Sequence, residues 1–175
     1  GYEIYVAPHF QLKLYEELTK AGKEFNIKPF GGRALMSMRL EKNWGAWTLD
    51  YRPDFTAKET GLDIFINWDK DFIGKKACLD EKKSGNKKKL ITMIIDTDDI
   101  DVTNDEAILK DKKCVGYITS GGYAHYVKKS MALGYVPIEL SKHDTNLEVE
   151  INGKFYSAKV IERPLYDANG GKMKS

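Results

Sequence analysis

The 175-residue sequence has only two cysteines, almost no net charge and no long apolar run. Cys78 and Cys114 are far apart and show no metal-ligand spacing, so we expect two reduced structural thiols. The 28 basic residues are balanced by 26 acidic ones, a formal net charge of +2 that gives no electrostatic footprint for nucleic acid or a membrane surface. No apolar stretch approaches the roughly 20 residues of a membrane span.

The sequence also lacks the common catalytic and metal-binding signatures. It contains no G-x-S-x-G, H-E-x-x-H, Walker or G-x-G-x-x-G motif. His9, His125 and His143 have no partner spacing, so we interpret them as surface or otherwise satisfied side chains. The acidic stretch 96–101 does not place carboxylates at the EF-hand positions, and we interpret it as a solvated loop. We therefore predict no metal site.

The composition does favour a folded core, with 42% hydrophobic residues and many aromatic side chains. In the first half, alternating apolar residues predict a strand over 2–6, which Pro8 ends. Apolar residues spaced three and four apart predict a helix over 9–25. The same half is expected to contain a helix over 33–41, an irregular stretch over 44–55, a strand over 62–68 and a short helix over 72–82.

A polar, lysine-rich segment over 82–89 is typical of a linker, and the composition changes after it. Turn signals occur there at Asn104-Asp105 and Gly121-Gly122, and Asn152-Gly153 predicts a hairpin with a type I′ turn. Short strands at this spacing predict a small antiparallel barrel or sandwich, so the expected fold class is α+β. The five predicted strands cover residues 90–95, 114–119, 130–136, 147–151 and 155–161.

Glu3 is a carboxylate in the middle of the first predicted strand, flanked by tyrosines. A buried carboxylate without a partner is energetically costly, so it needs hydrogen-bond donors. A ligand with two adjacent N–H donors, such as the amino group and ring nitrogen of a pterin, would match it bidentately, and Tyr5 could contact the ring. The alternative is that Glu3 is exposed or pairs with Arg33 or Arg39, and spacing alone favours this alternative.

Five sequence segments occur in an order that is itself informative. They are Gly-Tyr-Glu-Ile-Tyr at 1–5, Arg-Ala-Leu-Met-Ser-Met-Arg-Leu-Glu-Lys at 33–42, Asp-Phe-Ile-Gly-Lys-Lys-Ala at 71–77, Thr-Ser-Gly-Gly at 119–122 and Lys-Ser-Met-Ala-Leu-Gly-Tyr-Val-Pro at 129–137. Together they resemble the glycine-cleavage T-protein (aminomethyltransferase) family, and the resemblance extends to about Tyr166. Each motif is weak alone, but five in order are specific.

The resemblance implies a partial folate-binding aminomethyltransferase domain followed by a small antiparallel β-barrel domain. Residues 1–84 would form the C-terminal part of the folate-binding domain, 85–168 the barrel, and 169–175 a disordered tail. The sequence opens abruptly on a predicted strand, which we interpret as a sign that the chain is cut from a longer protein.

Details of the motifs favour one branch of the family. Arg-Leu-Glu-Lys at 39–42, the Trp47 that follows, and the acidic stretch after the first barrel strand resemble dimethylglycine and sarcosine dehydrogenases. In these flavoproteins the flavin oxidises an N-methyl amine to an iminium, and tetrahydrofolate captures the one-carbon unit as methylenetetrahydrofolate. The resemblance implies tetrahydrofolate and a methylated amine as ligands of the parent protein, FAD in a region upstream, and a cytoplasmic or, in a eukaryote, mitochondrial matrix location.

Individual roles follow from the matching positions. The Glu of the first motif contacts folate in the family, so Glu3 inherits that role, and Ile4 and Tyr5 are expected to line the same site. The family's catalytic Asp is expected upstream of residue 1, so no catalytic residue is assigned here. Simple T-proteins have an Arg where this chain has Leu35, and Arg33 could substitute for it.

Two other positions help to choose among members of the family. Ile64 stands where some dehydrogenase relatives place a Tyr. Asp71 stands where the non-enzymatic folate-binding regulators have a cysteine, which argues against a regulator of that kind. A stand-alone aminomethyltransferase and a sulfur-compound demethylase remain open. The family's folate site needs both halves of the module, so we expect the isolated chain to bind tetrahydrofolate poorly, to turn nothing over and to self-associate through the face left exposed.

Overall fold

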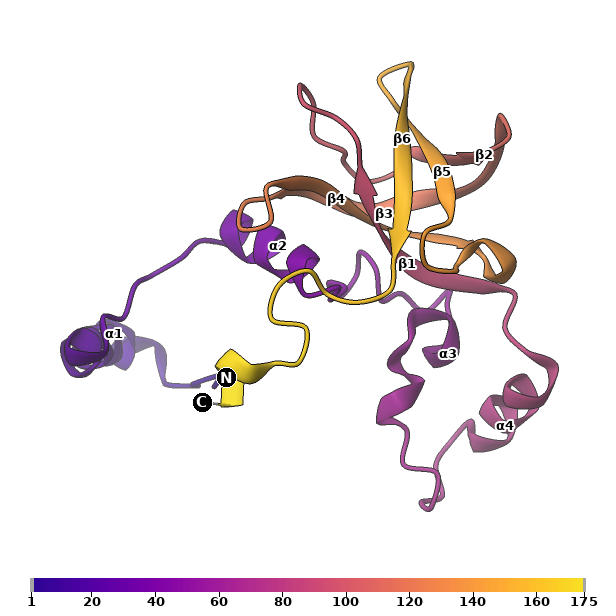
Figure 1. Ribbon diagram of the computed structural model, residues 1–175. Helices are drawn as coiled ribbons and strands as arrows, with labels where there is room; N and C mark the ends of the chain where they lie inside the picture. Colours follow the sequence, from indigo (N-terminus) through magenta and orange to yellow (C-terminus); the bar gives the residue numbers. More distant parts are fainter. Residues whose placement is uncertain (1, 175) are drawn as a thin grey trace. The chain divides into compact units, whose positions relative to one another are not determined.

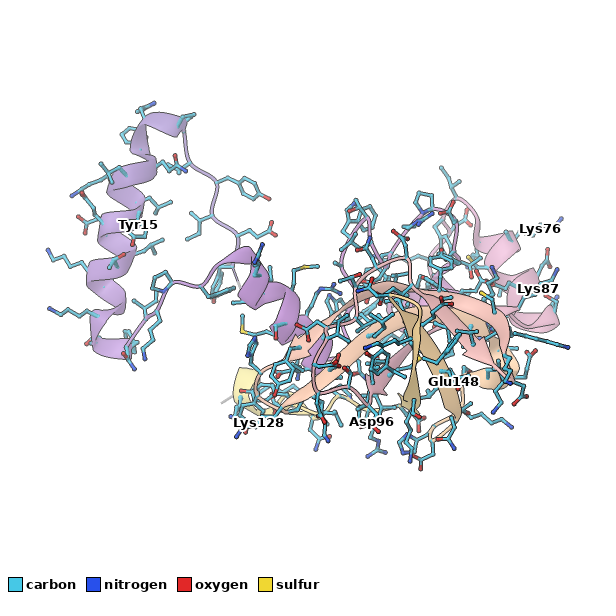
Figure 2. All side chains as sticks on the ribbon, turned by 90° about the horizontal axis from the view of Figure 1, so that it is seen from above. Tyr15, Lys76, Lys87, Asp96, Lys128 and Glu148 are labelled. Carbon is cyan, nitrogen blue, oxygen red and sulfur yellow. The ribbon has the colours of Figure 1, made fainter. Side chains whose placement is uncertain are left out.

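The computed structural model describes residues 2–174 as two compact units, which divide between Gly32 and Arg33 (Figure 1). The first unit contains the helix α1 (Gln11–Gly22), with short 3-10 turns before it at Pro8–Phe10 and after it at Lys23–Phe25. The predicted helix over 9–25 is therefore confirmed. Its side chains, Tyr15 among them, project from the helix in Figure 2, and none of them is buried.

The predicted strand over residues 2–6 is wrong, because residues 2–7 form neither a helix nor a strand. Tyr2 and Tyr5 are almost fully exposed. Alternation of apolar and polar residues gives a strand only where a second strand supplies its backbone hydrogen bonds, and the described chain provides none for this segment. The segment thus has no regular secondary structure, and its side chains are accessible.

The second unit begins with helices on the N-terminal side of a β-barrel. They are α2 (Gly32–Glu41), α3 (Ala57–Thr60), a 3-10 turn at Leu62–Phe65 and α4 (Lys75–Ser84). Residues 44–55 are irregular, as predicted, apart from one isolated bridge between Trp47 and Tyr51. The predicted strand over 62–68 is wrong, because Gly61, with φ of 78°, ends α3 and leads directly into the 3-10 turn.

Six antiparallel strands close into a barrel in the order β1-β4-β3-β2-β5-β6, which confirms the expected α+β class with a small β-barrel (Figure 1). The first and last strands close it, with Thr92 opposite Ile161. The strands are β1 (Lys88–Ile95), β2 (Ala107–Lys110), β3 (Lys113–Ala124), β4 (Lys129–Pro137), β5 (Asn146–Ile151) and β6 (Lys154–Ile161). After the barrel the described residues include a short helix, α5 (Gly171–Lys174), within the 169–175 stretch that was predicted to be a disordered tail.

All five predicted strands are present, and the hairpin at Asn152-Gly153 joins β5 to β6 with φ of 49° and 77°. Positive φ at both central residues is what a type I′ turn requires, so this prediction is confirmed. Gly121-Gly122, by contrast, is not a turn and lies inside β3. A Cβ at Gly121 would lie 2.6 Å from Val102 Cγ1, so this glycine allows the loop after β1 to cross the strand closely.

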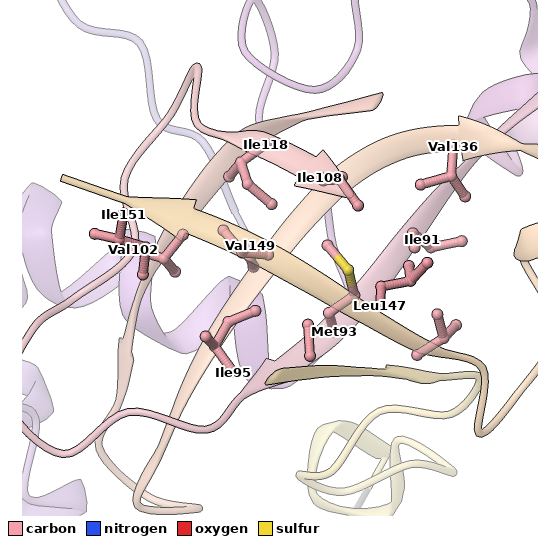
Figure 3. Packing of buried hydrophobic residues seen from close by; sticks show 13 residues of the cluster. Ile91, Met93, Ile95, Val102, Ile108, Ile118, Val136, Leu147, Val149 and Ile151 are labelled. Atoms are coloured by element: carbon pink, nitrogen blue, oxygen red, sulfur yellow. The ribbon is translucent and has the colours of Figure 1, made fainter. Parts of the chain in front are cut away.

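The barrel has an apolar interior and a second apolar cluster on its outer face. Figure 3 shows the interior, where side chains of the strands point toward one another and pack together. The interior cluster consists of Ile91, Met93, Ile95, Val102, Ile108, Ile118, Ala132, Val136, Leu147, Val149, Ile151, Ala158 and Val160. Outside the barrel, Leu40 at the end of α2 packs with Met131 and Leu133 of β4. This outer cluster fixes α2 on the barrel wall.

Candidate functional site

The first unit presents the candidate folate-binding segment as an exposed carboxylate held by a tyrosine. The hydroxyl of Tyr5 donates a hydrogen bond of 2.7 Å to Oε2 of Glu3. No other partner of Glu3 occurs among the described residues, so its second oxygen is free to accept hydrogen bonds from a ligand. Ile4 between them is about half exposed. The structure thus brings Glu3 and Tyr5 into contact and leaves the second carboxylate oxygen of Glu3 accessible.

Arg33, the other residue assigned by resemblance, belongs to the second unit. It lies in the first turn of α2 and its side chain is exposed. Leu35, which replaces the family's arginine, is also exposed on this helix. Ile64, in the 3-10 turn after α3, is exposed as well.

The second unit contains a buried polar cluster that sequence motifs did not predict; it consists of Arg39, Asp50, Thr119, Ser120 and Tyr135. Asp50 is completely buried, and one of its carboxylate oxygens accepts a hydrogen bond of 2.8 Å from the Arg39 guanidinium. The same oxygen accepts a bond of 2.6 Å from the backbone N–H of Ala46. The second oxygen accepts from the hydroxyls of Thr119 and Ser120 on β3. The buried carboxylate therefore has donors on both oxygens.

The Asp50 cluster joins the irregular stretch 44–55 to the outer wall of the barrel. The hydroxyl of Tyr135 on β4 donates to the backbone carbonyl of Asp50 over 2.8 Å. The ring of Phe55 stacks on that of Tyr135, with 3.5 Å between centroids. The hydrogen bond from Tyr135 and the stacking on its ring thus both attach the irregular stretch 44–55 to β4.

Two phenols at this junction have raised pKa values. Burial is the main cause for Tyr135, and the nearby charge of Asp50 acts in the same direction on its pKa. Burial also raises the pKa of Tyr51, which is opposed by the hydrogen bond that the Gly45 N–H donates to the phenol oxygen. Both phenols are therefore neutral at physiological pH, so they can donate hydrogen bonds and pack against other side chains.

A second buried carboxylate joins α2 to the β3–β4 hairpin. Glu41 is buried, and its Oε1 accepts hydrogen bonds from the backbone N–H groups of Tyr126 and Val127, at 2.6 Å and 3.3 Å. The backbone carbonyl of Glu41 accepts from the N–H of Tyr166 over 3.1 Å. The neighbouring Lys42 donates to the carbonyl of Asp167 over 2.6 Å. The end of α2 is thus bonded both to the barrel and to the chain that follows it.

These contacts explain two motifs. In the Arg-Leu-Glu-Lys motif, Arg39 binds Asp50 of the irregular stretch, and Glu41 accepts hydrogen bonds from the β3–β4 hairpin. Leu40 packs on the barrel wall, and Lys42 binds the C-terminal segment. In the Thr-Ser-Gly-Gly motif, the two hydroxyls bind Asp50. The structure agrees with the part of the alternative in which Glu3 is exposed, and the guanidinium of Arg39 is bound to Asp50.

The cysteines are both free, with Cys78 half-buried and Cys114 exposed. Within residues 2–174 no group of three or more His, Cys, Asp or Glu side chains is arranged to hold a metal ion. Over the same part of the chain, no helix has the length and apolar character to cross a membrane.

The chain combines a short helical region with a closed six-stranded barrel, and this fold is known from a solved structure. The chain superposes on the crystal structure of glycine cleavage system aminomethyltransferase T from Bartonella henselae with a TM-score of 0.81 and 23% sequence identity. The superposition covers 90% of this chain and 44% of that one. Two family models also match, the GCVT N-terminal domain over residues 1–70 and the glycine cleavage T-protein C-terminal barrel domain over residues 88–167. The chain belongs to the glycine cleavage T-protein family.

Curated proteins of two kinds are similar to this chain. Human mitochondrial dimethylglycine dehydrogenase is 40% identical over 167 residues, which is 94% of this chain and 19% of that protein. The rat protein of the same name is also 40% identical. An aminomethyltransferase from Synechocystis is 33% identical over 168 residues, 95% of this chain and 44% of that protein. The chain thus spans about a fifth of the first group and less than half of the second.

Proposed function

We propose that this chain is the folate-binding and barrel part of a one-carbon transfer enzyme of the dimethylglycine or sarcosine dehydrogenase type. The observation on which the proposal rests is the Glu3 carboxylate, which Tyr5 holds through one oxygen while the other stays accessible. The 40% identity to dimethylglycine dehydrogenases, against 33% to an aminomethyltransferase, supports the choice of branch.

The geometry at Glu3 fits a pterin ring. Each carboxylate oxygen has two acceptor sites, so Oε2 can accept from Tyr5 and from a ligand at the same time. An amino group next to a protonated ring nitrogen would then donate one N–H to each oxygen. The Tyr5 bond orients the carboxylate before binding, which reduces the entropy lost when the ligand binds. Tetrahydrofolate bound here would supply the nitrogen atoms that accept the one-carbon unit. The role of Glu3 and Tyr5 is to bind and orient the ring.

Other parts of the reaction would come from residues outside this sequence. We propose that the parent enzyme carries FAD and the catalytic aspartate there, and that the flavin oxidises a methylated amine. Cytoplasm or, for a eukaryotic parent, the mitochondrial matrix is the proposed location. Large exposed side chains such as Trp47 and Phe65 in the second unit are proposed to drive self-association when the chain is isolated.

The test replaces Glu3 in the full-length parent and measures tetrahydrofolate binding by titration calorimetry. A charge-assisted bidentate contact contributes about 1.5–3 kcal/mol, so Glu3→Gln should weaken binding by roughly 10- to 150-fold. Tyr5→Phe should have a smaller effect, because it removes only the orienting bond. Glu16→Gln, an exposed glutamate on α1, is the matched control and should leave affinity unchanged.

An unchanged affinity in Glu3→Gln would contradict the assignment. The branch is tested separately on the same parent. Bound flavin, seen by its visible absorption, supports the dehydrogenase type, whereas a parent without flavin that still binds tetrahydrofolate indicates a stand-alone aminomethyltransferase or a sulfur-compound demethylase.

A further inference from the structure

A cleft with a volume of about 720 Å³ opens at one mouth of the barrel. The loop after β1, residues 96–101, forms one side, and the end of the β3–β4 hairpin forms the other. Small-molecule ligands occupy clefts of about 300–1,000 Å³, so the size is suitable. The cleft is made only from residues of the second unit and does not depend on the folate assignment.

The floor of the cleft contains a buried hydroxyl without a partner. Ser130 on β4 is 3% exposed, and its Oγ has no hydrogen-bond partner among the described residues. It stands opposite Ile95 on one side and Tyr123 on the other, and cross-strand pairs of this kind point to the same face of a sheet. Since Ile95 points into the barrel, Ser130 points inward as well, at the end where the cleft opens.

An unsatisfied buried hydroxyl destabilises a fold by about 1–3 kcal/mol. Such groups are rare, and each one calls for a ligand, a solvent molecule or a functional role. Neighbouring Thr97 shows the contrast, because its hydroxyl donates to the carbonyl of Ile100 over 3.0 Å and accepts from that residue's N–H. The unpaired hydroxyl at the floor of the cleft therefore points to a polar ligand group.

Charges of both signs surround this hydroxyl. Asp96, Asp98 and Asp101 line one side, and their carboxylates have no ion-pair or hydrogen-bond partner in the described chain. Lys128 and Lys129 line the other side, also without partners there. Asp96 and Lys128 are labelled in Figure 2, where both lie along the same side of the barrel in that view. No three acidic or histidine side chains of residues 2–174 are arranged as metal ligands.

The acidic loop is held in place and is not a free tail. Val102, directly after it, is fully buried in the barrel core and lies against Gly121 of β3, where any Cβ would clash. At the other end of the loop, the N–H of Asp96 donates to the carbonyl of Ser157 over 2.8 Å. The loop thus presents its carboxylates at a fixed place opposite the lysines, and opposite charges can act on one ligand.

We propose that this cleft binds a small zwitterion of the amino-acid or dipeptide class. The ammonium group would face the carboxylates of the 96–101 loop, the carboxylate would face Lys128 and Lys129, and the hydroxyl of Ser130 would hydrogen-bond a polar atom between them. A ligand with one charge satisfies only one wall of the cleft, whereas a zwitterion satisfies both.

The test uses the 175-residue chain labelled with ¹⁵N and titrated with glycylglycine at low ionic strength, with amide chemical shifts as the measurement. Saturable shifts at Ser130, Asp98 and Lys128 are expected. Two blocked probes separate the charges: N-acetylglycylglycine has no ammonium and glycylglycine amide has no carboxylate. Each should bind at least about tenfold more weakly than glycylglycine, because one wall of the cleft is left without its counter-charge.

Two variants test the residues. Ser130→Ala should weaken glycylglycine binding about five- to tenfold, while Ser84→Ala, an exposed serine on α4, should leave it unchanged. Lys128→Gln, at an exposed position, gives the same test without altering the core, and should weaken glycylglycine but not its amide. Three results would overturn the proposal and indicate that the cleft holds only solvent. They are the absence of saturable shifts, equal binding of all three probes, and binding that is unchanged in the Ser130 and Lys128 variants.

Discussion

Removing the carboxylate of Asp50 is the sharpest test of how the irregular stretch is held on the barrel. In Asp50→Ala, the guanidinium of Arg39 loses its charged partner and keeps only its bonds to the Trp44 carbonyl and to Met36, while its side chain stays only 7% exposed. Removing one member of a buried ion pair costs about 3–5 kcal/mol, because the remaining charge stays away from water without compensation. Thr119 and Ser120 lose their shared acceptor as well. We expect the free energy of unfolding to fall by about 3–5 kcal/mol.

A loss of this size is a large part of the stability of an ordinary domain, which is about 5–15 kcal/mol. Urea unfolding measures it. Trp44 and Trp47 lie within the stretch that Asp50 holds. In a Trp68→Phe background, tryptophan fluorescence therefore reports that stretch, and far-ultraviolet circular dichroism reports the barrel. If the stretch detaches first, the fluorescence transition of Asp50→Ala will precede the dichroism transition, whereas in the unmodified chain we expect them to coincide.

Two further variants decide whether the ion pair is the cause. Arg39→Met combined with Asp50→Leu removes both charges, and apolar replacement of a whole buried pair is often neutral, so the double variant should recover much of the loss. Asp54→Ala removes one member of the exposed Arg52–Asp54 pair and should barely shift the urea midpoint. Equal losses in Asp50→Ala and Asp54→Ala would refute the reasoning.

Two other predictions concern the barrel wall and the stretch bound to it. Gly116→Ala should lower the free energy of unfolding, measured by urea titration, by about 2–3 kcal/mol or more, because the alanine Cβ would lie 1.9 Å from the carbonyl oxygen of Tyr135. Gly32→Ala is the control and should be neutral, because nothing lies within 4 Å of a Cβ at that position. Burial raises the pKa of Tyr51 and Tyr135 above that of an ordinary phenol, so the unfolded state loses these protons first. The two neutral phenols therefore contribute their full share to the free energy of unfolding below about pH 10, and this share is lost as the pH rises toward their pKa values in the folded state. A urea midpoint that stays constant from pH 9 to pH 11 would contradict this prediction.

Most of the barrel could be predicted because its signals are local. Alternation marks five strands, and Asn152-Gly153 supplies the φ values that its turn needs. The strand β2 was missed because it has only four residues and a bulge after Ile108. Gly121-Gly122 was misinterpreted as a turn because sequence does not show that Gly121 makes room for Val102. Glycine has both uses, and only the tertiary packing distinguishes them.

The candidate site was less predictable, since its contacts join distant parts of the sequence. Asp50 pairs with Arg39 eleven positions before it and with Thr119 sixty-nine positions after it, and no spacing rule links them. The motif residues were recognised by resemblance, but their physical role as partners of Asp50 was not. At Glu3 the carboxylate and Tyr5 were predicted together, while the strand that was to hold them is absent from the described chain.

The closure of the barrel by its first and last strands has a consequence for the order of events during synthesis. When β1 leaves the ribosome, neither β4 nor β6, its two neighbours, has yet been made. Asp50 likewise emerges well before Thr119 and Ser120, whose hydroxyls donate to its carboxylate in the folded chain. Non-local pairing of this kind is slow and leaves apolar strands uncovered in the meantime. The apolar strands of the nascent chain therefore stay uncovered until β6 has emerged and the barrel can close.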